Sequence, residues 1–154
     1  QAGLYISPDP LGLRGMNPTL YGYVANPHLR ADPFGLKGCK LKPADAADHD
    51  VILEIDRSVY REASDHIEEA IADGKPGIVT TGGNSTANRA ASLEGIPTWP
   101  GFDRDEWPMA MFKEGGANAD IRYIDPSDNR GLGSSIGAAL RGLGPGTRVK
   151  FAFI

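Results

Sequence analysis

The spacing of apolar residues divides the chain beyond residue 49 into short elements. Residues 50–55 contain four apolar side chains in a short run, which predicts a buried strand. Between residues 57 and 73 the apolar positions lie three and four residues apart, which predicts an amphipathic helix. The Gly-Lys-Pro-Gly run at 74–77 ends this helix, because glycine and proline both disfavour a helix interior.

The remaining pattern predicts a strand, a helix, a hairpin, a helix and a final strand. In chain order these cover residues 78–81, 85–93, 107–113 with 119–124, 127–143 and 147–154. Ser85 is the expected N-cap of the first of these helices, and Ser127 or Asp128 that of the second. Strands and helices mixed in this order predict a small α+β domain.

Residues 1–36 differ in composition from the rest. They hold five prolines and five glycines but four charged side chains. This composition disfavours helix and predicts extended chain broken by turns. The pattern Asp-Pro-x-Gly-Leu occurs twice, at 9–13 and 32–36, and by itself it is an ordinary turn signal. The change in composition near residue 37 predicts a separate globular unit over 37–154.

Composition and charge narrow the classes of function. The 154 residues include 20 glycines and 12 prolines, which argues against a long helical bundle. Apolar stretches fall short of a membrane span, so we expect no membrane partner. A net charge of -4 gives no general basic surface for nucleic acid, but it allows a local carboxylate site that acts on phosphodiesters. The single cysteine, Cys39, excludes an internal disulfide and is expected to be a bystander thiol.

The N-terminal segment carries a specific resemblance. Between the two Asp-Pro motifs lie three further signals: Asn17, Tyr21-Gly22-Tyr23 and Asn26-Pro27. Together, residues 4–36 resemble the end of an Rhs repeat-associated core, the junction that precedes a variable C-terminal toxin.

That resemblance implies a self-cleaving junction. Asp9 and Asp32 would form the autoproteolytic pair, and the chain would be cut after Leu36. Two neighbouring carboxylates can share a proton and so supply an acid and a base together. The resemblance divides the chain into the end of an Rhs core, 1–36, and a toxin domain, 37–154.

Three carboxylates and an arginine gather in residues 103–108, which read Asp-Arg-Asp-Glu-Trp-Pro. Such a run can be a solvated loop. Here it lies at the entry to the predicted hairpin, where Asp105 and Glu106 point to opposite sides unless the backbone bends. Asn129 lies near the start of the following helix. A hairpin followed by a helix that places an asparagine near the carboxylates of the hairpin is typical of a ββα-metal nuclease site.

From residue 85 to 154 the chain resembles the NucA/NucB deoxyribonucleases. The matching runs are residues 95–98, 100–110, 114–116, 119–123, 127–131, 133–134 and 146–149. The resemblance implies a metal-dependent DNA endonuclease with a His-Me finger-like core in which an aspartate replaces the usual catalytic histidine. The histidines of this chain agree, because none lies in the hairpin or the helix after it: His28, His49 and His66.

On this resemblance Asp105 is assigned as the general base, with Glu106 beside it in the catalytic group. Glu106 and Asn129 are the expected metal ligands, since their oxygens suit Mg²⁺ or Mn²⁺. Glu114 is a weaker candidate that could equally be a hairpin residue.

Four arginines are candidates for binding the phosphate and stabilising its developing charge. Arg104 belongs to the catalytic group, and the three expected to bind substrate are Arg89, Arg122 and Arg130. For Arg104, Arg122 and Arg130 a structural ion pair with Asp103, Asp120 or Asp128 is an equal alternative.

Other conspicuous side chains have structural explanations. His66 lies one residue from the apolar stripe of its helix, so we expect a packed or surface histidine and not a ligand. Trp107 is expected in the core and not as a base-stacking platform. Secreted members of the nuclease family tend to carry a cysteine pair near Thr80 and Phe112, and its absence here suits a reducing cytosol.

The two resemblances together imply an antibacterial toxin that cleaves the DNA of a competitor cell. It would be released from the Rhs shell of its parent protein, delivered by a contact-dependent system such as type VI secretion into the target cytoplasm, and neutralised by a cognate immunity protein. No small-molecule organic cofactor is expected. Two alternatives stay open: an RNA-directed nuclease, which would have to contact the 2′-hydroxyl, and a non-catalytic binding module on the same scaffold.

Overall fold

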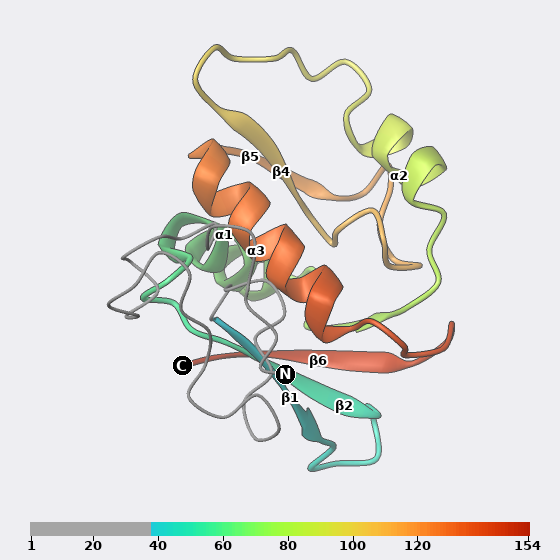
Figure 1. The fold of residues 1–154 in the computed structure, drawn as a ribbon. Coiled ribbons are helices and arrows are strands. Elements are labelled where there is room, and N and C mark those ends of the chain that lie inside the picture. The colour runs from blue at the N-terminus through green and yellow to red at the C-terminus, as the bar shows by residue number, and fades with distance from the viewer. Residues whose placement is uncertain (1–37) are drawn as a thin grey trace, which may run out of the picture. The chain divides into compact units, whose positions relative to one another are not determined.

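The computed structural model describes residues 38–154. The predicted autoproteolytic residues Asp9, Asp32 and Leu36 lie outside the described residues, as does the predicted boundary after residue 36. The described part of the chain has the mixed α+β architecture that the sequence predicts (Figure 1). Within it, no helix is both long enough and apolar enough to cross a membrane.

A four-stranded sheet supports one side of the helices. Its strands, in order across the sheet, are β1 (Cys39–Pro43), β2 (Val51–Ile55), β6 (Arg148–Phe153) and β3 (Ile78–Thr80). The central strands β2 and β6 run parallel, and the two outer pairs are antiparallel. The central strands supply much of the core, with Leu53, Ile55, Val149 and Phe151 buried. The strands predicted within 50–55, 78–81 and 147–154 are confirmed.

The edge strand β1 is absent from the sequence prediction. Its four residues after Cys39 are exposed, and two of them are lysines. Charged side chains of this kind protect the edge of a sheet from further pairing. The strand is held by backbone pairing with β2 and by a cross-strand ion pair between Lys42 and Glu54. Its sequence, Cys-Lys-Leu-Lys-Pro, does alternate apolar and charged residues, but a run of five residues that ends in proline is a weak strand signal.

Helices α1 (Arg61–Ala72) and α3 (Pro126–Ala139) contact each other and lie between the sheet and the hairpin (Figure 1). The helix predicted at 57–73 is confirmed, although it begins four residues later. Asp56 causes the delay, because its carboxylate accepts the Ser58 amide at 2.9 Å and holds a turn. The buried side chains of the two helices include Ile67, Ala70, Leu132 and Ile136.

The hairpin consists of β4 (Asp103–Trp107) and β5 (Asp120–Ile124). The predicted second arm is confirmed, but the first arm predicted at 107–113 is wrong, because the strand lies four residues earlier. Most of the predicted arm belongs to an irregular connection in which Phe112 bridges to Thr81. The sequence pattern does not predict β4 as a strand because three of its five residues are acidic. Their carboxylates are bound by residues of helices that are distant in sequence.

Helix α2 (Ser85–Ser92) and helix α3 are present as predicted, but their capping residues differ. The predicted cap Ser85 is wrong, because the side chain of Asn84 accepts the first-turn amide. The predicted caps Ser127 and Asp128 lie inside α3, and Asp125 accepts the amides of both. Helix α3 also ends four residues before its predicted end at 143.

Candidate active site

Strand β4 carries two consecutive carboxylates that are almost completely buried. Asp105 is 6% exposed and Glu106 is 4% exposed. Side chains alternate along a strand, and accordingly Asp105 contacts α1 while Glu106 contacts α2. A buried carboxylate is costly unless hydrogen bonds replace its water, so each helix supplies the donors that the strand requires.

Asp105 is held by a histidine of α1. The side chain of His66 is fully buried, and its Nδ1 lies 2.7 Å from Oδ2 of Asp105. Its Nε2 lies 2.9 Å from Oδ1 of Asp120 on β5. Asp105 also lines the neighbouring pocket, and its contact with His66 uses one of its two carboxylate oxygens. The prediction that His66 is packed is confirmed, but its contact with Asp105 was not foreseen.

These two contacts give both ring nitrogens of His66 a carboxylate partner. An ionised carboxylate only accepts hydrogen bonds, and a neutral imidazole donates from one nitrogen. The side chain of Asp105 is 7% exposed and that of Asp120 is 43% exposed, so the contact with Asp105 is the more deeply buried of the two.

Glu106 is held from several directions. Arg89 of α2 donates to its Oε1 from Nε at 3.3 Å and from Nη2 at 3.2 Å. The Ser92 hydroxyl donates to Oε2, and the Ala110 amide donates to Oε1 at 3.3 Å. These bonds fix the carboxylate and also fix Arg89, whose side chain is 68% exposed, at the edge of the pocket.

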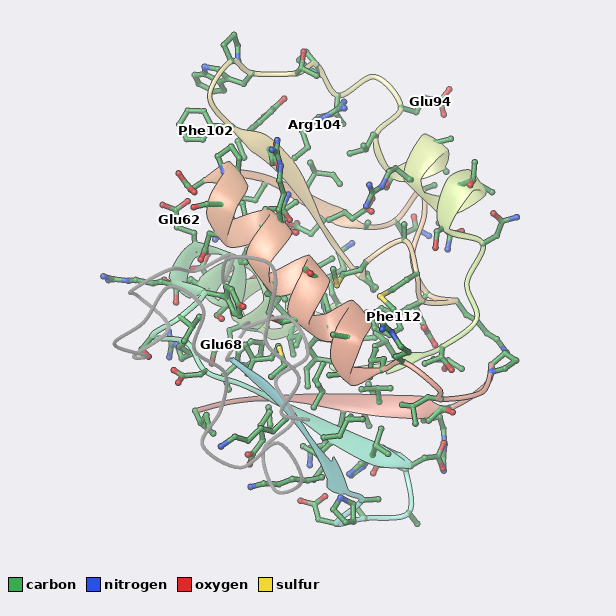
Figure 2. All side chains as sticks on the ribbon, in the orientation of Figure 1. Glu62, Glu68, Glu94, Phe102, Arg104 and Phe112 are labelled. Carbon is green, nitrogen blue, oxygen red and sulfur yellow. The ribbon has the colours of Figure 1, made fainter. Side chains whose placement is uncertain are left out.

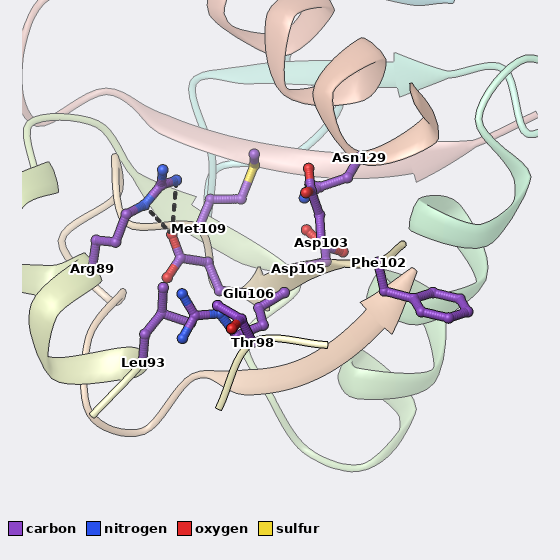
Figure 3. Close-up of a pocket in the computed structure, with 10 residues that line it drawn as sticks. Arg89, Leu93, Thr98, Phe102, Asp103, Asp105, Glu106, Met109 and Asn129 are labelled. Carbon is purple, nitrogen blue, oxygen red and sulfur yellow. Dashed lines mark hydrogen bonds and ion pairs between the residues drawn. The ribbon is translucent and has the colours of Figure 1, made fainter. Parts of the chain in front are cut away.

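A pocket of about 310 Å³ opens over these carboxylates (Figure 3). Its lining residues are Arg89, Leu93, Thr98, Phe102, Asp103, Arg104, Asp105, Glu106, Met109 and Asn129. Figure 3 shows Arg89 and Glu106 together on one side and Asp103, Asp105 and Asn129 on the other. The structure thus brings five predicted site residues from β4, α2 and α3 into one pocket: Arg89, Arg104, Asp105, Glu106 and Asn129.

Asp103 organises the side of the pocket that faces α3. Arg130 donates to its two carboxylate oxygens at 2.8 and 2.9 Å. These hydrogen bonds hold the pKa of Asp103 below its ordinary value. The Nδ2 group of Asn129 lies 3.4 Å from the same carboxylate, which leaves the amide oxygen of Asn129 available as a ligand. Arg130 therefore takes the structural ion pair that the sequence left open.

The other two arginines have different surroundings. Arg104 lines the pocket and donates from Nη1 to the carbonyl oxygen of Ile96 at 2.6 Å. Arg122 pairs with Glu69 of α1 at 2.7 Å, and it is not among the residues that line the pocket. The structure therefore does not bring Arg122 into the site, whereas the guanidinium of Arg104 keeps donors for a ligand.

Two residues outside the pocket have structural roles. Glu114, the weaker metal candidate, accepts the Thr80 amide at 2.8 Å and so joins the hairpin connection to β3. Cys39 is half-buried, and burial raises the pKa of its thiol to about 12. A thiol with so high a pKa stays protonated and unreactive at neutral pH, as expected for a bystander. Among residues 38–154 no group of three or more His, Cys, Asp or Glu side chains is arranged to hold a metal ion.

Sequence comparison finds a relative that aligns with most of the chain. No family model matches. The chain is 40% identical over 111 residues to the DNA-entry nuclease of Bacillus subtilis (strain 168), and the match covers 71% of this chain and 76% of that protein. Stretches of 39 and 37 residues are each 54% identical to the probable deoxyribonucleases RhsB and RhsA of Dickeya dadantii (strain 3937). These stretches span a quarter of this chain but only 3% and 2% of those proteins.

Proposed function

Because the chain belongs to the family of the DNA-entry nuclease, the NucA/NucB-like proteins, we propose that its pocket hydrolyses phosphodiester bonds of DNA. The observation that carries this proposal is the buried Asp105, which His66 contacts through one carboxylate oxygen and which also lines the pocket. The substrate class is supported by the names of its relatives, a DNA-entry nuclease and two probable deoxyribonucleases.

Asp105 is the proposed general base. Its second carboxylate oxygen takes a proton from the attacking water as the new oxygen–phosphorus bond forms. The bond to the leaving oxygen breaks at the same time, and that oxygen departs with the bonding electron pair and takes a proton from solvent water. His66 keeps the carboxylate in one orientation and is therefore a positioning residue. A well-placed general base contributes about 10²–10⁴-fold to a rate, so Asp105 is the residue whose loss is expected to matter most.

Arginines at the pocket are the proposed phosphate contacts. Arg104 donates one hydrogen bond to Ile96, and its remaining N–H groups can bind phosphate oxygens. Arg89 lies at the pocket edge, fixed by Glu106. Positive groups placed beforehand stabilise the charge that develops on the phosphate. For Arg122 and Arg130, which pair with Glu69 and Asp103, we propose a structural role.

A divalent cation, Mg²⁺ or Mn²⁺, is the proposed cofactor. The carboxylate and amide oxygens that line the pocket suit these ions, whereas the Met109 sulfur beside them does not. Mg²⁺ is commonly held by one or two protein ligands with water and substrate phosphate. Asn129 would hold it through its amide oxygen. Glu106, the other predicted ligand, would have to release Arg89 to do so. When bound, the cation would supply positive charge to the scissile phosphate.

The first test is nicking of supercoiled plasmid by the full 154-residue chain. Cleavage is expected with Mg²⁺ or Mn²⁺ and is expected to stop with a chelator. Asp105→Asn keeps the size of the side chain and an oxygen for His66, but it cannot take the proton, so the rate should fall at least about 100-fold. The matched control is Asp65→Asn, which removes an exposed ion pair with Arg57 and should leave the rate within about twofold.

The outcome also separates the alternatives. Intact plasmid with the unmutated chain in both metals, together with cleavage of RNA under the same conditions, would replace DNA by RNA as the substrate. Failure on both nucleic acids would favour the non-catalytic binding module. Equal cleavage by Asp105→Asn and the unmutated chain would remove Asp105 from the mechanism.

The setting of this activity is proposed from the similarity to the two Rhs deoxyribonucleases. We propose that the parent protein releases the nuclease by autoproteolysis after Leu36, with Asp9 and Asp32 as the carboxylate pair. Delivery into a target cell and a cognate immunity protein complete the proposal. In the parent Rhs protein, Asp32→Asn is expected to leave the chain uncut, which mass spectrometry of the purified protein would show.

A further inference from the structure

Three aromatic side chains form an exposed cluster beside the pocket. Trp99 is 59% exposed and Phe102 is 47% exposed, while Tyr123 of β5 is half-buried. The ring centroids of Trp99 and Phe102 lie 5.8 Å apart, and those of Trp99 and Tyr123 lie 5.5 Å apart, both edge to face. Single exposed apolar residues are common on protein surfaces, whereas a contiguous group marks a binding surface. We call Trp99, Phe102 and Tyr123 the aromatic face.

A tight turn presents two of these rings. The Phe102 amide donates to the carbonyl oxygen of Trp99 at 3.1 Å, which closes a four-residue turn with Pro100 second and Gly101 third. Gly101 has a φ of 87°. A type II turn requires a positive φ at this third position and favours proline at the second. Because the first and last residues of such a turn lie close together, the sequence itself sets Trp99 beside Phe102.

The hairpin holds the segment before this turn. Arg104 donates to the carbonyl oxygen of Ile96, and the Tyr123 hydroxyl donates to that of Pro97. Arg104 and Tyr123 are directly paired across β4 and β5, so their side chains lie on the same side of the hairpin. The segment that carries Trp99 is therefore held in place by Arg104, which also lines the pocket, and by Tyr123 of the aromatic face itself. A surface fixed beforehand loses little conformational entropy on binding.

The aromatic face borders the pocket at Phe102, the one of its three residues that lines the pocket. Phe102 and Thr98, which lie at either end of the segment with Trp99, line the pocket together with Asp105. Figure 3 shows Phe102 beyond Asp103 and Asn129, and Figure 2 shows Phe102 and Arg104 at the same end of the molecule. A nucleotide whose phosphate occupies the pocket would thus have its neighbouring base within reach of the aromatic rings.

The charges near the pocket do not favour capture of a duplex through its backbone. Arg89 and Arg130 are each paired with a carboxylate, so Arg104 is the lining arginine whose donors are left for a phosphate, beside three carboxylates of the same pocket. The protein carries a net charge of -4. A duplex turns its phosphates outward and keeps its bases stacked inside, whereas an unpaired base offers a flat face to an aromatic ring. We propose, on the basis of the nuclease function proposed above, that the aromatic face stacks an unpaired base beside the scissile phosphate. Single-stranded or locally unpaired DNA is then the favoured substrate.

The test measures binding separately from cleavage. The full chain carrying Asp105→Asn is titrated, in the presence of a chelator, with a labelled 12-nucleotide single strand, the same strand with abasic sites throughout, and a 12-base-pair duplex. Stacking on an aromatic side chain is worth about 5- to 150-fold in affinity per base. Adding Trp99→Ala should weaken binding of the normal strand by that factor and change binding of the abasic strand and the duplex by less than about twofold.

Two further variants control this measurement. Trp99→Phe keeps an aromatic ring and should restore most of the affinity. Leu41→Ala, which truncates an exposed apolar residue on β1, should have no effect. Trp99 is the exposed one of the two tryptophans, since Trp107 is fully buried, so the normal strand should also quench its fluorescence.

Equal affinity of the Trp99→Ala chain and its parent for the normal strand would overturn the inference and leave the aromatic face to a protein partner. An equal loss on the abasic strand would overturn it as well, because no base could then be responsible. Plasmid nicking by the unmutated chain is scored separately. If the unmutated chain does not nick plasmid but the single strand still binds through Trp99, the nuclease proposal is overturned and the base-binding surface is not.

Discussion

At the scale of single residues, the site depends on how one carboxylate is oriented. The strand fixes the side of the hairpin on which Asp105 lies, and His66 of α1 orients its carboxylate through the 2.7 Å contact with Oδ2. His66 is in turn fixed by Asp120 at 2.9 Å. When a series of side-chain contacts positions a catalytic group, breaking one contact lowers the reaction rate even if the base itself is intact.

Two amide variants of His66 test this orientation. Asn places its Nδ2 near the position of the histidine Nδ1 and can still donate to Asp105, whereas Gln reaches the position of Nε2 and can donate to Asp120. His66→Asn is therefore expected to cleave plasmid at least about tenfold faster than His66→Gln, with KM unchanged in both. Thermal unfolding of both variants is the control, and equal midpoints are expected. Equal rates in two folded variants would mean that His66 has only a structural role.

The residues of the pocket could be predicted to a large extent from sequence. The order of hairpin and helix and the family resemblance together predict that Asp105, Glu106 and Asn129 form one site, although strand alternation alone points Asp105 and Glu106 to opposite sides, and the structure brings all three into one pocket. His66 could not be found in this way. A histidine beside the apolar stripe of a helix looks the same whether it meets a core side chain or a catalytic carboxylate, because its partner is 39 residues away in the chain.

At the scale of elements, α1 and α3 cap each other. The N-cap residue of α1, Tyr60, gives no side-chain cap, and the Ala63 amide donates instead to Oδ2 of Asp128 on α3 at 2.8 Å. In return the Asp125 amide donates to Glu62 of α1 at 2.8 Å. Local capping rules predicted Asp128 as a cap of its own helix. It caps the neighbouring helix, which only the tertiary structure can show.

The pH dependence of stability tests this shared cap. Burial raises the pKa of Asp128, so the folded state binds the Asp128 proton more tightly than the unfolded state does. The stability that this proton contributes is lost as pH rises through the folded pKa. Asp128→Asn keeps an oxygen for Ala63 and removes the charge. It should match the unmutated chain at pH 3 in urea unfolding and be the more stable of the two at pH 7.

The alanine variant supplies the contrast. Asp128→Ala removes the acceptor for the α1 amide and is expected to lose about 1 kcal/mol at both pH values, the usual cost of a lost helix cap. If Asp128→Asn were as destabilised as Asp128→Ala at pH 7, the charge itself would be required, and the cap would be an electrostatic one.

At the scale of the whole described unit, an aromatic cluster joins the hairpin to the large sheet. Trp107 at the end of β4 lies 4.7 Å from Phe151 of β6, measured between ring centroids, and Phe112 lies 5.8 Å from Phe151. Trp107 also donates from Nε1 to the carbonyl oxygen of Pro76 at 3.1 Å. The prediction that Trp107 belongs to the core is confirmed. The site is thus anchored, two residues beyond Asp105, to a strand more than 40 residues away in the chain.

Removing the ring of Phe151 should therefore affect the site only through the fold. Phe151→Ala leaves a cavity beside Trp107 and is expected to destabilise the protein by about 3–5 kcal/mol in urea unfolding. The exposed control Leu41→Ala should change stability by less than about 0.5 kcal/mol. Because the chemical groups remain, plasmid cleavage per folded molecule by Phe151→Ala should stay within about twofold of the unmutated chain at low temperature. Asp105→Asn should instead be folded and inactive. A Phe151→Ala chain that is folded but inactive would contradict the prediction and show that the aromatic cluster also affects the geometry of the catalytic residues.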